Sequence, residues 1–342
     1  MLDSCRCGRA LTRARVLPQA GHVMNIVLTG SIAFDYLMSF PGRFRDHILA
    51  DRLDRLSLSF LVDSLIRRRG GIAANIAFTM ALLGERPLVM ATAGEDFEDY
   101  RRWLEEHGVD TSAIRVIPGL LTASFFVHTD QVNAQIASFY TGAMARAVDL
   151  HFADLATPSD LAVISPNDPL AMQAYVDECG QLGIPFIYDP SQQTVRLEPD
   201  VLRRGIGRAR ALFCNDYEFG LISEKTGLGL DAMVEQVEFL VITRGEHGAD
   251  MYQAGTTFHV PAVPPARLAD PTGVGDAFRG GFLKGYAHGL PLERCGQMGA
   301  LAAAYCLEEE GTQGHHFTLA EFLERFRRTF DGGSELDRLV RG

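Results

Sequence analysis

The stretch Asp270-Pro-Thr-Gly-Val-Gly-Asp276-Ala-Phe278 is the most informative part of the chain, and the residues after it follow a helical pattern. Gly273 and Gly275 let the backbone turn tightly, so that successive N–H groups can point into one hollow. The positive end of the following helix adds to this hollow, which predicts an anion site suited to a transferring phosphoryl group. Asp276 lies at its mouth, where a carboxylate can accept a hydroxyl proton. Taken alone, the residues also fit a Gly-rich loop whose Asp caps a helix.

On either side of this stretch, short apolar runs alternate with helical patterns. The alternation predicts an α/β fold with a mostly parallel central sheet flanked by helices on both faces. The expected strands are Asn25–Thr29, Leu88–Thr92, Leu161–Ser165, Pro185–Tyr188, Ala211–Cys214 and Phe239–Thr243. The expected helices are Ala73–Leu83, Phe97–His107, Pro169–Leu182 and Tyr217–Thr226, followed by a hairpin at Asp250–Val260 and helices at Asp276–His288, Leu292–Glu309 and Leu319–Phe330.

Two stretches, Phe34–Ile66 and Thr122–Tyr140, alternate apolar and polar residues without intervening helices. They predict a small antiparallel β lid, which would exclude water from a reacting phosphate. The first 23 residues are rich in arginine and lack a continuous apolar stretch, and Met24 directly precedes the first expected strand. We therefore expect a disordered extension over 1–23, one domain over 24–330 whose lid spans about 34–66 and 122–140, and a C-terminal tail over 331–342.

Composition narrows the class of protein. The chain has 342 residues, of which 47% are hydrophobic, and a net charge of −11. An acidic chain lacks the basic face that binds nucleic acid or anionic membranes, and no apolar run is long enough to span a bilayer. The six cysteines show no zinc-type spacing, which favours free thiols and a cytoplasmic location. No P-loop pattern G-x-x-x-x-G-K-[ST] occurs.

The run DPTGVGDAFRGGFLKG resembles the C-terminal signature of the ribokinase-like (PfkB) carbohydrate and nucleoside kinases. A second signature of that family, two glycines followed by a small-residue helix bearing an Asn, is matched by GGIAANIAF at 70–78. The two motifs occur in the family's order, and the resemblance extends from about Met24 to Phe330. It implies a ribokinase-like fold with a β lid, and an ATP-dependent phosphotransferase that uses Mg²⁺ and an alcohol acceptor.

The resemblance also implies roles for individual residues. Asp276 corresponds to the family's catalytic base, and Gly273, Val274 and Gly275 to the amides of the anion hole. Gly70 and Gly71 correspond to the hinge of the lid, Asn75 to a contact with a substrate hydroxyl, and Asp35 to the carboxylate that binds sugar hydroxyls. A carboxylate suits this last role because it can accept hydrogen bonds from two neighbouring hydroxyls. Without the resemblance, Asp35 is more simply a turn residue.

On the nucleotide side, the resemblance assigns a metal and a base-binding turn. Asn215 and Glu218 match the family's N-x-x-E motif, which holds Mg²⁺ largely through water, although Asn215 could instead cap a helix. The nucleotide-binding turn is matched by Thr243, Arg244, Gly245 and Gly248. Asp270 and Thr272, with 311–313, resemble the monovalent-cation loop of the members that need K⁺.

The chain departs from the sugar-kinase pattern after one central strand. Sugar kinases often carry D-P-N-x-R there, whereas this chain has Asp189-Pro-Ser-Gln-Gln-Thr194 with no basic residue before Arg196. This departure and the GDAFRGG run are more similar to the bacterial adenosine-kinase-like branch. Phe125, Phe126 and Phe139 on the expected lid could stack on a purine, or form the lid's own core.

We therefore expect phosphorylation of the 5′-hydroxyl of a nucleoside, with adenosine the preferred acceptor. The alternatives are a sugar kinase of ribose or fructose type, another nucleoside kinase, and a non-catalytic scaffold. The intact T-G-x-G-D motif argues against the scaffold. The expected ligands are ATP and a small nucleoside or sugar, and the expected state is a monomer or homodimer.

Overall fold

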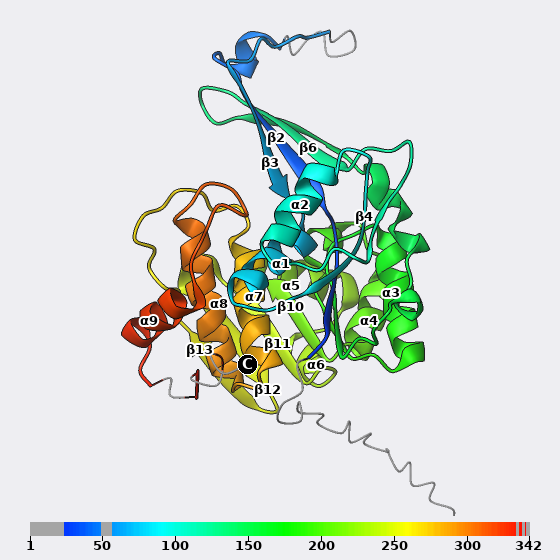
Figure 1. The fold of residues 1–342 in the computed structure, drawn as a ribbon, viewed down its shortest axis with the longest axis vertical. Coiled ribbons are helices and arrows are strands. Elements are labelled where there is room, and N and C mark those ends of the chain that lie inside the picture. Colours follow the sequence, from blue (N-terminus) through cyan, green and yellow to red (C-terminus); the bar gives the residue numbers. More distant parts are fainter. Residues whose placement is uncertain (1–23, 49–56, 333–334, 337–338, 340–342) are drawn as a thin grey trace, which may run out of the picture.

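A computed structural model describes residues 24–48, 57–332, 335–336 and 339. Its main body is a nine-stranded sheet in the order β13-β12-β11-β10-β9-β8-β1-β4-β5 (Figure 1). The seven strands from β11 to β5 in this order are parallel, and β12 and β13 add an antiparallel hairpin at one edge. The strands are β1 (Ile26–Thr29), β4 (Leu88–Ala93), β5 (Ile114–Val116), β8 (Leu161–Ile164), β9 (Phe186–Tyr188), β10 (Ala211–Asn215), β11 (Phe239–Thr243), β12 (Ala249–Gln253) and β13 (Thr256–Val260).

Helices cover both faces of this sheet because its strands are apolar on both sides. Ile26 and Leu28 of β1 join the core of one face, whereas Val27 joins the core of the other. The first core contains residues of α1 (Ile72–Leu82), α2 (Glu98–Glu106), α7 (Val274–Ala287), α8 (Leu292–Leu307) and α9 (Leu319–Thr329). The second contains residues of α3 (Pro169–Leu182), α4 (Pro199–Arg208), α5 (Asp216–Thr226) and α6 (Leu230–Val234). The predicted α/β class with a mostly parallel sheet is confirmed.

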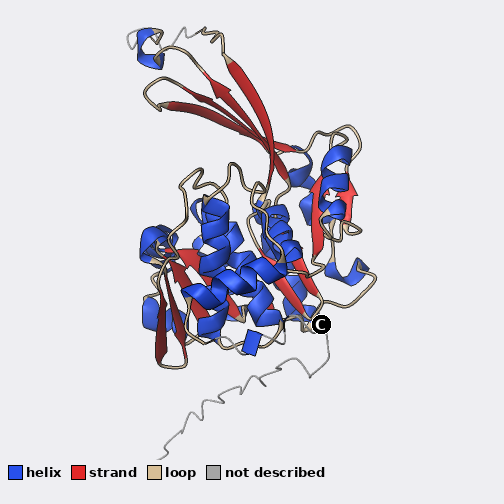
Figure 2. Cartoon of the chain, turned by 60° about the vertical axis from the view of Figure 1, so that its left-hand side comes forward, coloured by secondary structure: helices blue, strands red, loops and turns tan. Residues whose placement is uncertain are grey.

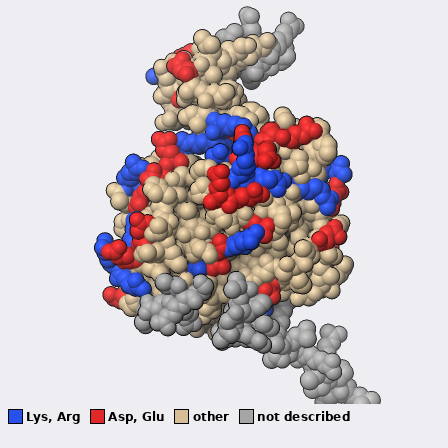
Figure 3. Space-filling view, in the orientation of Figure 1, with Lys and Arg blue, Asp and Glu red and all other residues tan. Residues whose placement is uncertain are grey.

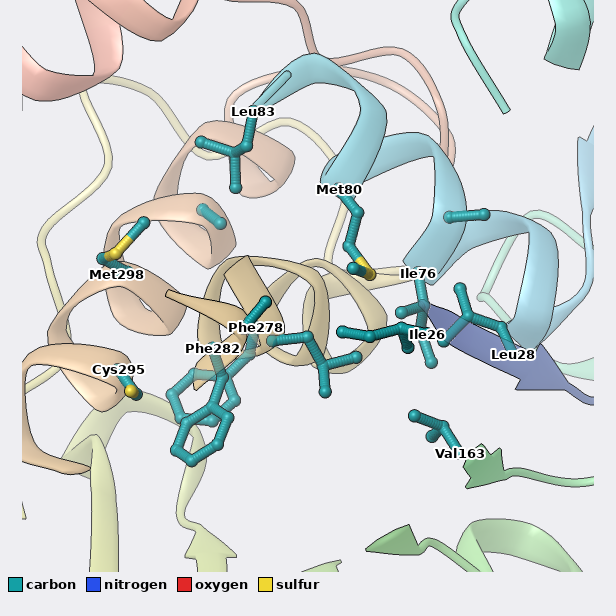
Figure 4. Close-up of a cluster of buried hydrophobic side chains, with 14 of the residues drawn as sticks. Ile26, Leu28, Ile76, Met80, Leu83, Val163, Phe278, Phe282, Cys295 and Met298 are labelled. Carbon is teal, nitrogen blue, oxygen red and sulfur yellow. The ribbon is translucent and has the colours of Figure 1, made fainter. Parts of the chain in front are cut away.

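Helix α7 lies at the centre of the first core. Phe278 and Phe282 on α7 pack in the same cluster as Ile76 and Met80 of α1 (Figure 4). Close approach of these helices depends on Gly280, since a Cβ there would lie 2.6 Å from the Thr79 Cβ. The packing fixes the start of α7 relative to α1.

A second sheet of four strands, the lid sheet, projects from the body (Figure 2). Its order is β3-β2-β6-β7, with β2 (Ala33–Ser39), β3 (Ser64–Gly70), β6 (Ala123–Thr129) and β7 (Gln135–Tyr140). The expectation of a wholly antiparallel sheet is wrong, because β2 and β6 pair in parallel. Each of these two strands has its own antiparallel partner, β3 for β2 and β7 for β6, so the lid sheet consists of two antiparallel pairs joined by one parallel pairing.

The expected elements agree closely with those of the structure, apart from β5, α4 and α6, which were not expected. The extension over 1–23 lies outside the described residues, as do parts of the tail over 331–342. Within the described part of the chain, every helix is too short or too polar to cross a bilayer.

Candidate active site

The predicted site residues follow the carboxyl ends of the parallel strands. Residues 30–35 follow β1, Asp189 follows β9, Asn215 ends β10 and Thr243 ends β11. Ligands of open α/β sheets bind at this edge, because loops and helix N-termini converge there. The lid sheet grows from the same edge, since β2 begins four residues after β1 ends (Figure 1).

The glycines around the start of α7 leave its first turn open. Gly273 has φ +81°, and a Cβ there would lie 2.8 Å from the Thr312 Cβ, so both the conformation and the space demand glycine. Among the described residues, no side chain caps α7 at Gly273. The first amides of α7, from Val274 and Gly275 onward, therefore remain available for an anion.

Asp276 lies in this first turn and is held by Asn75 of α1. The Asn75 Nδ2 donates a hydrogen bond of 2.8 Å to the Asp276 Oδ2. Burial raises the pKa of Asp276 to about 6, although the charge of Arg279 and the Asn75 hydrogen bond oppose the shift. A carboxylate of this kind is ionised at neutral pH and is a better proton acceptor than an ordinary Asp.

A hydrogen-bond network that sequence reasoning missed fixes the Asn75 amide. Gln313 donates to the Asn75 Oδ1 over 3.0 Å and to the Tyr100 hydroxyl. Trp103 donates from its indole nitrogen to the Gln313 Oε1 over 3.1 Å, which sets the orientation of the Gln313 amide. With its oxygen thus occupied, Asn75 presents its NH₂ group to Asp276. Gln313 was noted in sequence only as part of a loop, and no local pattern marks Tyr100 or Trp103.

A buried ion pair beside Asp276 was missed as well. Arg279, 7% exposed, makes two hydrogen bonds to the fully buried Asp189, and donates to the Ser191 hydroxyl and, over 3.0 Å, to the Gly275 carbonyl. The basic residue absent from the segment after β9 is therefore supplied by α7. The signal in the sequence was Arg279 itself, three residues after Asp276 on a helix.

The acceptor side of the site joins the lid strands β2 and β3. Gly70 ends β3 and faces Asp35, since a Cβ on Gly70 would lie 2.8 Å from the Asp35 Oδ2. Gly71 has φ +96°, and a Cβ there would lie 2.5 Å from the Ser31 carbonyl oxygen. The Gly70 carbonyl accepts a hydrogen bond of 2.9 Å from the Tyr100 hydroxyl. Burial raises the pKa of Asp35 to about 6, against the charge of Arg68 and assisted by that of Asp270.

The N-x-x-E pair caps helix α5. The Asn215 Oδ1 accepts from the Glu218 N–H over 2.7 Å, and the Glu218 Oε2 accepts from the Asn215 N–H over 2.8 Å. Burial raises the pKa of Glu218, and the charge of Asp189 adds to the shift. A nearby cation would stabilise the ionised form of this buried carboxylate, and Mg²⁺ keeps most of its water ligands. Asn215 and Glu218 therefore fit a Mg²⁺ ion bound through water.

The predicted nucleotide turn follows β11 at the same edge of the sheet. Arg244 donates its backbone N–H to the Gly248 carbonyl over 2.7 Å, and its side chain pairs with Asp250 at 2.9 Å. Gly248 has φ +85°, and a Cβ there would lie 2.1 Å from the Val260 carbonyl oxygen. Thr243 pairs with Ala249 of β12, which closes the turn, while Gly245 has φ +55° and faces open space.

The residues assigned to a monovalent cation do not fit one. The Asp270 carboxylate accepts hydrogen bonds from the Thr272 N–H, the Gly311 N–H and the Arg68 guanidinium. Cys306 donates its S–H to the Thr272 carbonyl over 3.6 Å. An ion at Asp270 would therefore lie next to a guanidinium, and repulsion between like charges opposes that.

Together these residues can transfer a phosphoryl group to a hydroxyl. The open amides of α7 can bind the charge of the group in transit, and Asp276 can take the hydroxyl proton. Asp35 lies at the lid end, where it can orient the acceptor. Asn215, Glu218 and the turn after β11 lie at the carboxyl ends of β10 and β11, where a nucleotide can bind.

Known proteins are similar to this chain in sequence and in fold. A model of the pfkB family of carbohydrate kinases matches residues 42–317. A nucleoside kinase of Methanothermobacter thermautotrophicus is 30% identical over 315 residues, which cover 88% of this chain and 95% of the relative. A cytidine kinase of Thermococcus kodakarensis is 29% identical over 252 residues, which cover 71% of this chain and 88% of the relative.

The structure of Burkholderia thailandensis nucleoside kinase in complex with inosine has a TM-score of 0.80 and 38% identity to this chain. The match covers 90% of this chain and 98% of that structure. A second structure of the same kinase, in complex with ADP-inosine, has a TM-score of 0.78. The folds therefore agree over nearly the whole described region.

Proposed function

This chain belongs to the pfkB family of carbohydrate kinases and is an ATP-dependent phosphotransferase with an alcohol acceptor, and we propose that it phosphorylates the 5′-hydroxyl of a nucleoside, preferably adenosine. The observation that carries the proposal is the position of Asp276, in the open first turn of α7 and hydrogen-bonded to Asn75. The similarity to kinases named for nucleosides supports the acceptor class.

The proposed reaction is a direct in-line transfer. The 5′-oxygen attacks the γ-phosphorus of ATP, Asp276 takes the proton of the hydroxyl, and the bond from the γ-phosphorus to the bridging oxygen breaks to release ADP. The amides of Gly273, Val274 and Gly275 stabilise the negative charge on the phosphoryl oxygens. Asn215 and Glu218 would hold Mg²⁺, largely through water, and the bound ion would neutralise part of the phosphate charge.

The lid sheet supports a nucleoside over a free sugar. Asp35, Phe125 and Phe139 are neighbours in register across β2, β6 and β7, so their side chains share one face of the sheet. A carboxylate next to two aromatic rings suits a ribose joined to a base. The preference for adenine over other bases rests on the GDAFRGG run and on the segment after Asp189, which resemble the bacterial adenosine-kinase-like branch.

An acceptor screen tests the proposal. The full chain is assayed with MgATP and adenosine, inosine, cytidine, ribose or fructose, and the position of the new phosphate is read by ³¹P NMR. Stacking of one base contributes about 1–3 kcal/mol, so kcat/KM for adenosine should exceed that for ribose by roughly tenfold to a hundredfold. Ribose or fructose equal to adenosine would overturn the nucleoside assignment, while inosine or cytidine ahead of adenosine would overturn only the choice of base.

A further inference from the structure

We propose that Arg68 of the lid strand β3 is the fixed cation of the loop that leads into α7, and that it makes the kinase independent of monovalent ions. The proposal concerns the loop and not the acceptor, so it needs only the phosphotransferase activity and holds for any acceptor hydroxyl.

The contacts of Arg68 place its charge on Asp270. The Arg68 Nη1 donates to the Asp270 Oδ2 over 2.7 Å, and the Nη2 donates to the Glu310 Oε2 over 2.8 Å. The Asp270 Oδ2 also accepts the Gly311 N–H over 3.0 Å, and the Oδ1 accepts the Thr272 N–H over 2.9 Å. Although burial acts in the opposite direction, these bonds and the Arg68 charge lower the pKa of Asp270. Both oxygens of the Asp270 carboxylate thus already accept hydrogen bonds from the protein.

The loop is shaped to accommodate this side chain. Gly311 has φ +79°, and a Cβ there would lie 3.2 Å from the Arg68 Cδ, so Arg68 packs directly on the glycine. Arg68 and Asp270 are only 22% and 18% exposed as side chains. A charge-assisted pair that is largely shielded from water is stronger than an exposed one.

The surroundings of Asp270 require positive charge. Glu308, Glu309 and Glu310 follow the C-terminus of α8, where the helix dipole is negative. Arg325 pairs with Glu308 and Arg267 pairs with Glu309. Arg68 supplies the cation for Asp270 and Glu310. Basic and acidic side chains intermingle where the lid meets the body in Figure 3. Arg68 therefore supplies the positive charge that a bound monovalent ion would otherwise supply.

The position of Arg68 also connects the acceptor end of the site to the anion hole. Arg68 is the register partner of Asp35 across β2 and β3, and its charge opposes the rise in the Asp35 pKa. On the other side, Thr312 donates its hydroxyl to the Arg69 carbonyl over 3.0 Å and packs against Gly273, the N-cap of α7. Removing the Arg68 charge should therefore disturb the acceptor carboxylate and the start of α7 together.

The test compares the parent with Arg68→Ala, in buffers of equal ionic strength that contain either K⁺ or tetramethylammonium. We expect the parent to show the same rate and the same melting temperature in both buffers, within about twofold for the rate. Arg68→Ala should lose roughly tenfold or more in kcat/KM in tetramethylammonium, the scale of one lost charge-assisted bond. In K⁺ the kcat/KM of Arg68→Ala should be several-fold higher than in tetramethylammonium, and the melting temperature of this variant should rise.

Two further variants separate charge from folding. Glu310→Gln removes only the exposed partner, whose side chain is 76% exposed, and should change the rate by less than about threefold with no response to K⁺. Arg68→Lys keeps the charge, and it should stay indifferent to K⁺ even if Arg68→Ala is too unstable to assay. Activation of the parent by K⁺ of fivefold or more would overturn the proposal. So would an Arg68→Ala variant whose rate and melting temperature both ignore K⁺.

Discussion

Asp276 carries a negative charge in a place that favours its neutral form. Its pKa of about 6 lies above the ordinary value of 3.8, because burial outweighs the help of Arg279 and Asn75. The native state therefore binds a proton more readily than the unfolded chain between about pH 4 and pH 6. As the pH rises through this window, ionisation costs native stability, and above about pH 6 the full cost is present. The proposed role of Asp276 as a base thus opposes the stability of the fold.

Replacing Asp276 by Asn should therefore separate rate from stability. We expect kcat to fall by roughly 10²-fold or more, the usual scale for loss of a general base, while the affinity for ATP changes little. At pH 8 the variant should be more stable than the parent by about 1–2 kcal/mol, which is less than the full pKa shift implies because water partly screens the side chain. This difference in stability should vanish by pH 4. Stopped-time assays and thermal melts across this pH range measure both effects.

A matched control is Asp231→Asn, which changes the same residue type in the first turn of another helix, α6, away from the site. This variant should keep its rate and lose slightly in stability, since an acid at a helix start is favourable. If Asp276→Asn kept half of the parent's rate, Asp276 would not be the base.

At the scale of elements, the lid sheet has two unlike faces. Phe125 and Phe139 lie on the face of Asp35, whereas Phe126 lies on the opposite face and stacks on Tyr36 with ring centroids 4.8 Å apart. Of the three aromatics that the sequence singled out, two can therefore meet a base bound beside Asp35, and one belongs to the packing of the lid.

This difference predicts the effect of single substitutions. Phe125→Leu or Phe139→Leu should lower kcat/KM for adenosine about tenfold, the scale of one stacking contact, and should change it less for ribose. Phe126→Leu serves as the control, because it should lower the melting temperature without altering the ratio between the two acceptors. An equal loss for adenosine and ribose in both Phe125→Leu and Phe139→Leu would exclude stacking by this face.

The same comparison of elements shows what the sequence could predict. Strands such as β8 and β11 are buried on both sides and appear as plain apolar runs, so their positions could be predicted. Helix α4 could not, because it contains Gly205 and Gly207, which weaken a helical pattern. Gly205 is explained only by the fold, since a Cβ there would lie 2.5 Å from the Tyr188 ring.

The candidate site likewise contains residues that the sequence could predict and residues that it could not. Asp276, Asn75 and Asp35 belong to contiguous motifs and were predicted as site residues. The Arg279–Asp189 pair spans 90 residues of sequence, and the Arg68–Asp270 pair spans 202. The residues of these pairs come together only because the fold brings distant elements to one edge of the sheet. No local spacing in the sequence could therefore reveal them.

At the scale of the whole molecule, the main sheet buries far more apolar surface than the lid sheet does. The main sheet lies between two large cores. The apolar contacts of the lid sheet with the body are those of Phe34 and Tyr36 with the first core and a small cluster of Ala33, Ala123 and Met144. All six residues of β7 are exposed. Regions with few buried contacts open at lower free energy than the rest of a protein. The lid should therefore open while the main sheet stays closed, except at the end of β3 next to the body, where Arg68 is bound to Asp270.

Hydrogen exchange measures this difference directly. Amides of β2 and β6 should exchange faster than those of β1, β8 and β10. Their exchange should slow when adenosine is added, because in the proposed complex the acceptor bridges Asp35 and the start of α7. The hairpin β12–β13 lies at the far edge of the main sheet and serves as an internal control, so its exchange should not respond to adenosine alone. Equal protection of the two sheets without ligand would mean that the lid is a rigid part of the body. Closure over the phosphate would then have to come from another segment, because a sheet as stable as the core cannot open and close in each catalytic cycle.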